Sequence, residues 1–103
     1  MPMNVKGRWD LAQGDGNTVA LSLDQQGESF SGEATIDGPA GQITESMSGV
    51  VTDSDMSFRV GTVLYIGSFA QGRLYGLSID FQNVAKQVTW FAPKHFHPLE
   101  DPP

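Results

Sequence analysis

Apolar and polar residues alternate along most of this chain, and short turn-forming sequences separate the alternating segments. In the stretch 18–26, for example, Val19, Leu21 and Leu23 are separated by small or polar residues. A period of two is typical of a strand that buries one face and exposes the other. Turn sequences such as GDGN at 14–17 recur about every ten residues, and no window has a helical period. The pattern therefore predicts an all-β protein.

We expect about eight strands, separated by these turns. They lie at 5–13, 18–26, 28–37, 42–52, 55–62, 64–71, 73–82 and 87–94. Tight links between consecutive strands favour an antiparallel up-and-down β-barrel, which leaves no free edge. A β-sandwich is the alternative, because periodicity does not separate the two. We expect residues 1–94 to form this single domain and the proline-rich residues 95–103 to form an extended tail.

The same alternation predicts which side chains face the interior. In the first five strands these are Trp9, Leu11, Val19, Leu21, Leu23, Phe30, Gly32, Ala34, Ile36, Ile43, Met47, Gly49, Val51, Met56, Phe58 and Val60. In the last two they are Tyr75, Leu77, Ile79, Phe81, Val88, Trp90 and Ala92. Residues 63–66 (VLYI) are apolar on both faces, so alternation does not orient that strand.

A pocket inside the barrel is the main functional hypothesis from the sequence. Its expected lining combines large apolar side chains with one carboxyl: Trp9, Phe30, Glu45, Met47, Phe58, Tyr65, Phe69 and Trp90. Gly32 and Gly49 would leave empty volume beside these side chains, as a small apolar pocket requires. Glu45 shares the inward parity of Met47, and a carboxyl among apolar groups could act as a general acid or base. If a bulge shifts the register, Glu45 instead faces water.

Gly7-Arg8-Trp9 opens the first strand, and Trp90 lies in the last. A G-x-W entry strand followed by a meander of short strands resembles the calycin group of lipocalin-like and avidin-like barrels. The resemblance implies that Trp9 plugs one end of a barrel with a ligand-binding interior. A T-D-Y turn motif is missing, and only Lys86 or Lys94 could cover Trp9. The polar contacts of a biotin site have no counterpart either, so biotin is not implied.

Charge and composition narrow the range of partners. The net charge is -6, and the six lysines and arginines are scattered along the chain, which disfavours nucleic acids and anionic membranes. Without cysteine there is no disulfide or thiolate chemistry. Residues 1–10 contain no apolar signal-peptide core, and no apolar run has the length of a membrane span. A cytoplasmic location is the default expectation.

No established catalytic or cofactor motif is present, so we predict no cofactor and assign no catalytic residue. His95 and His97 lie on one side of an extended segment, followed by Glu100 and Asp101. Such a set could hold a metal. Histidines beside a proline-rich end are more commonly solvated, so we assign no metal site.

Three functions are compatible with these features. The leading one is binding of a small apolar or amphipathic molecule in the interior. The alternatives are a lyase-, isomerase- or cyclase-type enzyme that uses an interior carboxyl, and a protein-interaction or inhibitor-like barrel. Apolar residues on both faces of the last three strands also predict a homo-oligomer, most simply a dimer. Its interface would contain Leu64, Ile66, Leu74 and Phe91.

Overall fold

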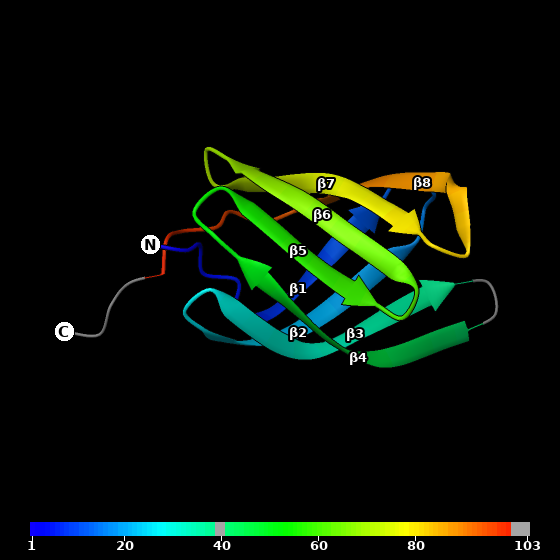
Figure 1. The fold of residues 1–103 in the computed structure, drawn as a ribbon, viewed down its shortest axis with the longest axis horizontal. Coiled ribbons are helices and arrows are strands. Elements are labelled where there is room, and N and C mark those ends of the chain that lie inside the picture. The colour runs from blue at the N-terminus through cyan, green and yellow to red at the C-terminus, as the bar shows by residue number, and fades with distance from the viewer. Residues whose placement is uncertain (39–40, 100–103) are drawn as a thin grey trace.

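The computed structural model describes residues 1–38 and 41–99, which form a closed barrel of eight antiparallel strands (Figure 1). The strands are β1 (Gly7–Gln13), β2 (Thr18–Gln26), β3 (Ser29–Gly38), β4 (Gly41–Val51), β5 (Asp55–Val60), β6 (Val63–Ala70), β7 (Arg73–Asp80) and β8 (Asn83–Ala92). Each strand pairs with the next, and β8 pairs with β1. The predicted up-and-down barrel is confirmed, and the sandwich alternative is excluded. None of the described residues forms a helix long and apolar enough to cross a membrane.

The two ends of the barrel differ in what covers them. At one end, on the left in Figure 1, the N-terminal segment and residues 95–99 lie beside the β2–β3, β4–β5 and β6–β7 turns. Hydrogen bonds join the two segments, since Asn4 N donates to His97 O and Leu99 N donates to Pro2 O. We call this the closed end. The opposite end, which we call the open end, carries the β1–β2, β5–β6 and β7–β8 turns.

The ladders around the barrel are unequal in length. The β3–β4 ladder pairs ten residues of each strand, whereas the β4–β5 ladder pairs four and, within the described residues, the β1–β8 ladder pairs two. The first half of β4 and of β8 therefore extends past its neighbour with a free edge. Glu45 and Lys86 occupy positions of inward parity on these edges, and charged residues there hinder pairing of an edge with another chain. This placement protects the two longest unpaired segments.

The interior is filled by the side chains that the strands turn inward. The buried cluster contains Met3, Val5, Trp9, Leu11, Val19, Leu21, Leu23, Phe30, Ala34, Met47, Val51, Met56, Phe58, Val60, Tyr65, Leu74, Trp90, Ala92 and Phe96. At the closed end the Phe96 ring packs edge-on against Trp9 and Phe69, with centroid distances of 5.0 and 5.5 Å. Trp9 Nε1 donates to Val5 O at 2.9 Å, so the indole has its polar partner within the plug. Lys94 covers Phe96 rather than Trp9, with Nζ 4.9 Å from the ring centroid.

The predicted orientation of β7 is wrong by one residue. Leu74, Gly76, Ser78 and Asp80 face the interior, whereas Tyr75, Leu77, Ile79 and Phe81 face outward. The physical reason is the Trp90 indole, which fills the interior where β6 and β7 pass. Gly67 and Gly76 pair there, and a Cβ atom on either would collide with the Trp90 ring. Beside the Trp90 ring the interior has room only for small residues such as glycine and serine. The more apolar set of β7 side chains therefore faces outward.

The expectation that Gly32 and Gly49 leave empty volume is also wrong. A Cβ atom on Gly32 would overlap the backbone oxygen of Ser22, and one on Gly49 would lie 2.7 Å from the Phe30 ring. These glycines mark places where neighbouring strands and rings approach closely. They are therefore needed for tight packing of the core and do not create a pocket.

Candidate functional site

The structure brings the aromatic residues of the predicted pocket together, in contact with one another. Phe58 stacks on Tyr65 with centroids 4.8 Å apart and an interplanar angle of 4°. Phe30 lies 6.0 Å from Phe58, and Trp90 lies 6.3 Å from Tyr65. Trp9 and Met47 are buried in the same core, and Phe69 packs on it at the closed end. The rings fill the middle of the barrel, and Tyr65 also lines a cavity at the open end.

Glu45 does not lie in an apolar environment. It has the inward parity of β4, opposite Ala34, but it sits on the free edge beyond the last β4–β5 pair. Its side chain is exposed, with its carboxylate beside Gly61 in the β5–β6 turn. The enzyme hypothesis required a carboxyl surrounded by apolar groups, and Glu45 does not meet that requirement.

The two histidines near the C-terminal end lie side by side on the surface, with ring centroids 4.8 Å apart. Glu100 and Asp101, which the sequence placed beside them, are outside the described residues. Within the described part of the chain, no three histidine or acidic side chains gather as they would around a metal ion.

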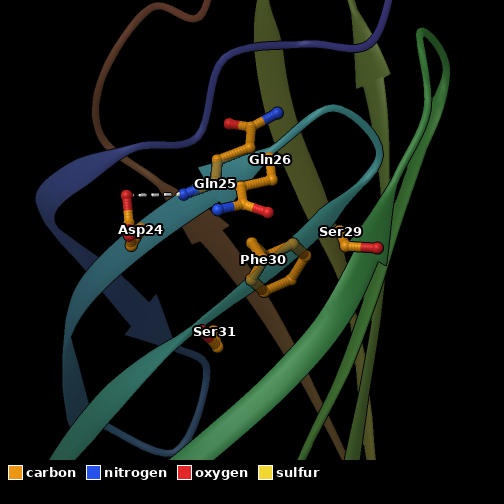
Figure 2. A pocket seen from close by; sticks show the side chains of 6 residues that line it. All are labelled: Asp24, Gln25, Gln26, Ser29, Phe30 and Ser31. Carbon is orange, nitrogen blue, oxygen red and sulfur yellow. Dashed lines mark hydrogen bonds between the residues drawn. The ribbon is translucent and has the colours of Figure 1, made fainter.

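A hollow of about 270 Å³ lies on the β2–β3 hairpin. Figure 2 shows its six lining side chains, which come from the two strands of this hairpin: Asp24, Gln25, Gln26, Ser29, Phe30 and Ser31. The side-chain amide of Gln25 lies in this hollow and is already hydrogen-bonded to the N-terminal segment. Oε1 accepts from Val5 N at 2.9 Å, and Nε2 donates to Met3 O and Gly27 O. The Gln25 side chain of this hollow therefore stabilises the closed end.

A cavity at the open end combines apolar walls with ordered polar groups. It has a volume of about 150 Å³. Ile36, Val63 and Val88 supply apolar surface from three strands. The polar lining consists of Gln13, Asp15, Asn17, Tyr65, Ser78, Asp80 and Lys86. We call this cavity the mouth pocket.

A chain of hydrogen bonds crosses the mouth pocket from the core to the β1–β2 turn. Tyr65 Oη donates to Gln13 Oε1 at 3.0 Å, and Gln13 Nε2 donates to Asp15 Oδ1 at 3.2 Å. Asn17 N also donates to Asp15 Oδ1, at 3.0 Å. On the opposite wall Ser78 Oγ donates to Val88 O at 3.2 Å. These partners fix the polar groups before any ligand arrives.

Negative charges outnumber positive charges around the mouth pocket. Asp15 and Asp80 contribute two carboxylates, and Lys86 contributes one ammonium. Burial by itself would raise the pKa of Asp15, but hydrogen bonds from Asn17 and Gln13 and the charge of Lys86 lower it below its ordinary value. Asp80 Oδ1 accepts from Thr62 Oγ1 at 3.1 Å and from Gln82 N at 2.9 Å. The lining therefore has an excess of negative charge.

Tyr65 stays protonated at neutral pH and serves as a hydrogen-bond donor. Burial, with a smaller contribution from the Asp15 charge, raises the pKa of Tyr65 to about 12.

Beside Tyr65 in the core, Trp90 Nε1 is buried and has no acceptor among the described residues. A buried donor without a partner costs about 1–3 kcal/mol.

We expect the free energy of unfolding to fall as the pH rises from about 10 to about 12. The unfolded chain ionises its tyrosines near pH 10, while folded Tyr65 keeps its proton up to about 12, so the stabilisation is complete below pH 10 and lost above 12. The difference is at most about 2–3 kcal/mol. Urea unfolding at several alkaline pH values measures it. Tyr65→Phe should lose this part of the alkaline decline, and an identical decline in both proteins would contradict the assignment.

Sequence reasoning missed most of the mouth pocket. Residues 14–17 were assigned only a turn, although Asp15 and Asn17 line the cavity. Ser78 and Asp80 were missed because the orientation of β7 was wrong. Lys86 has the same inward parity as Val88 and Trp90. A lysine at an inward position was the one feature of the sequence that could have indicated a polar cavity there.

Neither a family of known proteins, nor a curated protein, nor a solved structure matches this chain, so the barrel and its mouth pocket are described from their own geometry.

Proposed function

We propose that the protein binds a small amphipathic molecule in the mouth pocket at the open end of the barrel. The observation that carries the proposal is the combination of three apolar walls with a preordered chain of hydrogen bonds from Tyr65 to Asn17. Binding sites for small molecules usually have this composition, in which apolar surface provides affinity and a few fixed polar groups provide orientation.

The size of the mouth pocket limits the ligand to about one ring. A cavity of 150 Å³ engineered in another protein holds a single benzene molecule, and the mouth pocket has the same volume. Ligand sites for larger molecules have volumes of about 300–1,000 Å³. The rings of the core block deeper entry, since Tyr65 is stacked on Phe58 directly below.

The charge of the lining selects the polar end of the ligand. Two carboxylates against one ammonium favour a cationic or neutral group over an anionic one, and the net charge of -6 acts in the same direction. We therefore infer a one-ring amine or alcohol as the ligand class, with its ring on Ile36, Val63 and Val88.

The calycin resemblance supports the same assignment. In that group the first tryptophan plugs one end of the barrel, and the interior binds the ligand. Trp9 is buried at the closed end here, and the mouth pocket is at the opposite end. An eight-stranded barrel has an interior wide enough for side chains or one small ligand.

NMR titration with benzylamine, benzyl alcohol and benzoate tests the proposal. We expect saturable shifts of the amides of residues 13–17, Ser78 and Val88, strongest with benzylamine and weakest with benzoate. Ile36→Trp fills the pocket and should abolish these shifts. Ile43→Trp is the matched control, because Ile43 pairs with Ile36 across the same hairpin but does not line the cavity. No saturable shifts, or equal effects of the two variants, would refute the proposal.

A further inference from the structure

The outer surface of β6, β7 and β8 carries a continuous apolar patch. Its members are Leu64, Ile66, Tyr75, Leu77, Ile79 and Phe91, which we call the apolar face. Neighbouring strands place them side by side, since Ile66 pairs with Leu77, Leu64 with Ile79, and Tyr75 with Phe91. Ile66, Tyr75 and Phe91 are 44, 51 and 53% exposed. Leu74, which the sequence assigned to this surface, is instead 1% exposed inside the barrel.

The apolar face also differs from the rest of the barrel in charge. Among the described residues, the outward positions of the paired β6–β8 sheet contain no carboxylate, and Arg73 is their one charged residue. The outer surface of β1–β3 instead carries the four carboxylates Asp10, Asp24, Glu33 and Asp37, and Arg8 is its one cation among the described residues. For a chain with a net charge of -6, contact between two copies elsewhere brings like charges together. At the apolar face this repulsion is smallest.

The chain itself does not cover this surface within the described residues. Phe96 and Leu99, the apolar residues of the C-terminal segment, lie at the closed end. The Phe96 ring is buried against Trp9 and Phe69, and Leu99 N is bonded to Pro2 O. The apolar face is therefore left for another molecule.

We infer that a second copy of this chain packs on the apolar face to form a twofold symmetric dimer. About half of each exposed aromatic side chain, or about 100 Å², is available at Tyr75 and at Phe91. With the four aliphatic side chains the patch falls in the range of about 300–600 Å², and a stable interface needs about 800 Å² per partner. The flanking Ser68, Gln87 and Thr89 are exposed and add a polar rim around this patch. Two such sheets can pack face to face, as in a sandwich.

Light scattering coupled to gel filtration tests the inference. We expect twice the chain mass of 11.1 kDa at micromolar concentration. Ile66→Lys and Phe91→Lys should each raise the dimer Kd by at least about tenfold, because each buries a charge at the centre of the contact. Ser22→Lys is the matched control, as Ser22 is exposed on the outer surface of β2. Circular dichroism establishes that all variants keep the barrel.

Salt gives a second, independent readout. Because the apolar face itself carries no carboxylate while each chain has a net charge of -6, added NaCl should lower the dimer Kd by screening the net repulsion. A monomer at about 100 μM would overturn the inference, as would a dimer that Ile66→Lys and Phe91→Lys leave intact. A monomer that sediments with neutral phosphatidylcholine vesicles would likewise overturn it and would assign the apolar face to a lipid surface.

Discussion

Replacing Phe96 by alanine is expected to lower the free energy of unfolding by about 3–5 kcal/mol, the usual cost of truncating a buried aromatic side chain. Phe96 is 2% exposed and contacts both Trp9 in β1 and Phe69 in β6, so its loss opens a cavity between these two strands. The total free energy of unfolding of a small domain is only about 5–15 kcal/mol. Urea unfolding, followed by the fluorescence of Trp9 and Trp90, measures the change.

Phe81→Ala is the matched control for this prediction. Phe81 is 49% exposed, and its main contact is with the Arg59 guanidinium, 4.8 Å from the ring centroid. Its truncation should cost less than about 1 kcal/mol. If the two variants unfold at the same urea concentration, the closed end does not depend on Phe96.

Gly67→Ala and Gly76→Ala should each destabilise the barrel by about 1–3 kcal/mol, because the added methyl group has no free space. At Gly67 the new atom would lie 2.6 Å from the Trp90 ring and 2.9 Å from Leu74. At Gly76 it would overlap the backbone oxygen of Ile66 as well as meeting the Trp90 ring. The first collision is with side chains and the second is with the backbone.

A double-mutant cycle with Trp90→Leu separates these two causes. In the smaller Trp90→Leu core, Gly67→Ala should lose most of its cost, whereas Gly76→Ala should keep it because the Ile66 carbonyl does not move. The coupling energy between Gly67 and Trp90 is expected to be about 0.5–3 kcal/mol. If Trp90→Leu reduced the destabilisation by Gly67→Ala and by Gly76→Ala equally, the Trp90 ring alone would account for the need for glycine at both positions.

The fold could be predicted where each strand has one face in water. Alternation in β2 and β5 identified Val19, Leu21, Met56 and Phe58 as interior residues, and all four are buried. The same rule failed in β7, because alternation measures apolar character and the interior at that level is already filled by Trp90. A single large ring from another strand therefore reversed the orientation expected for a whole strand.

The mouth pocket could not be predicted for a related reason. Besides Gln13 and Tyr65, its polar groups come from the β1–β2 turn, from the inward face of β7 and from the part of β8 that extends past β1. Which residues overhang depends on the lengths of the ladders, and strand periodicity carries no information about register between strands distant in sequence. The predicted lining residues were the largest inward side chains, and these fill the core because they are large.

The short β1–β8 ladder has a consequence for how the barrel assembles. The other seven ladders join strands that are neighbours in sequence, so they can form as local hairpins at a small cost in loop entropy. The β1–β8 contact joins the two ends of the chain, and its two residue pairs repay little of the entropy lost in closing so long a loop. We therefore expect this ladder to form after the seven hairpin ladders. We also expect the native barrel to open there more readily than at the longer ladders, beside Gln13 and the mouth pocket.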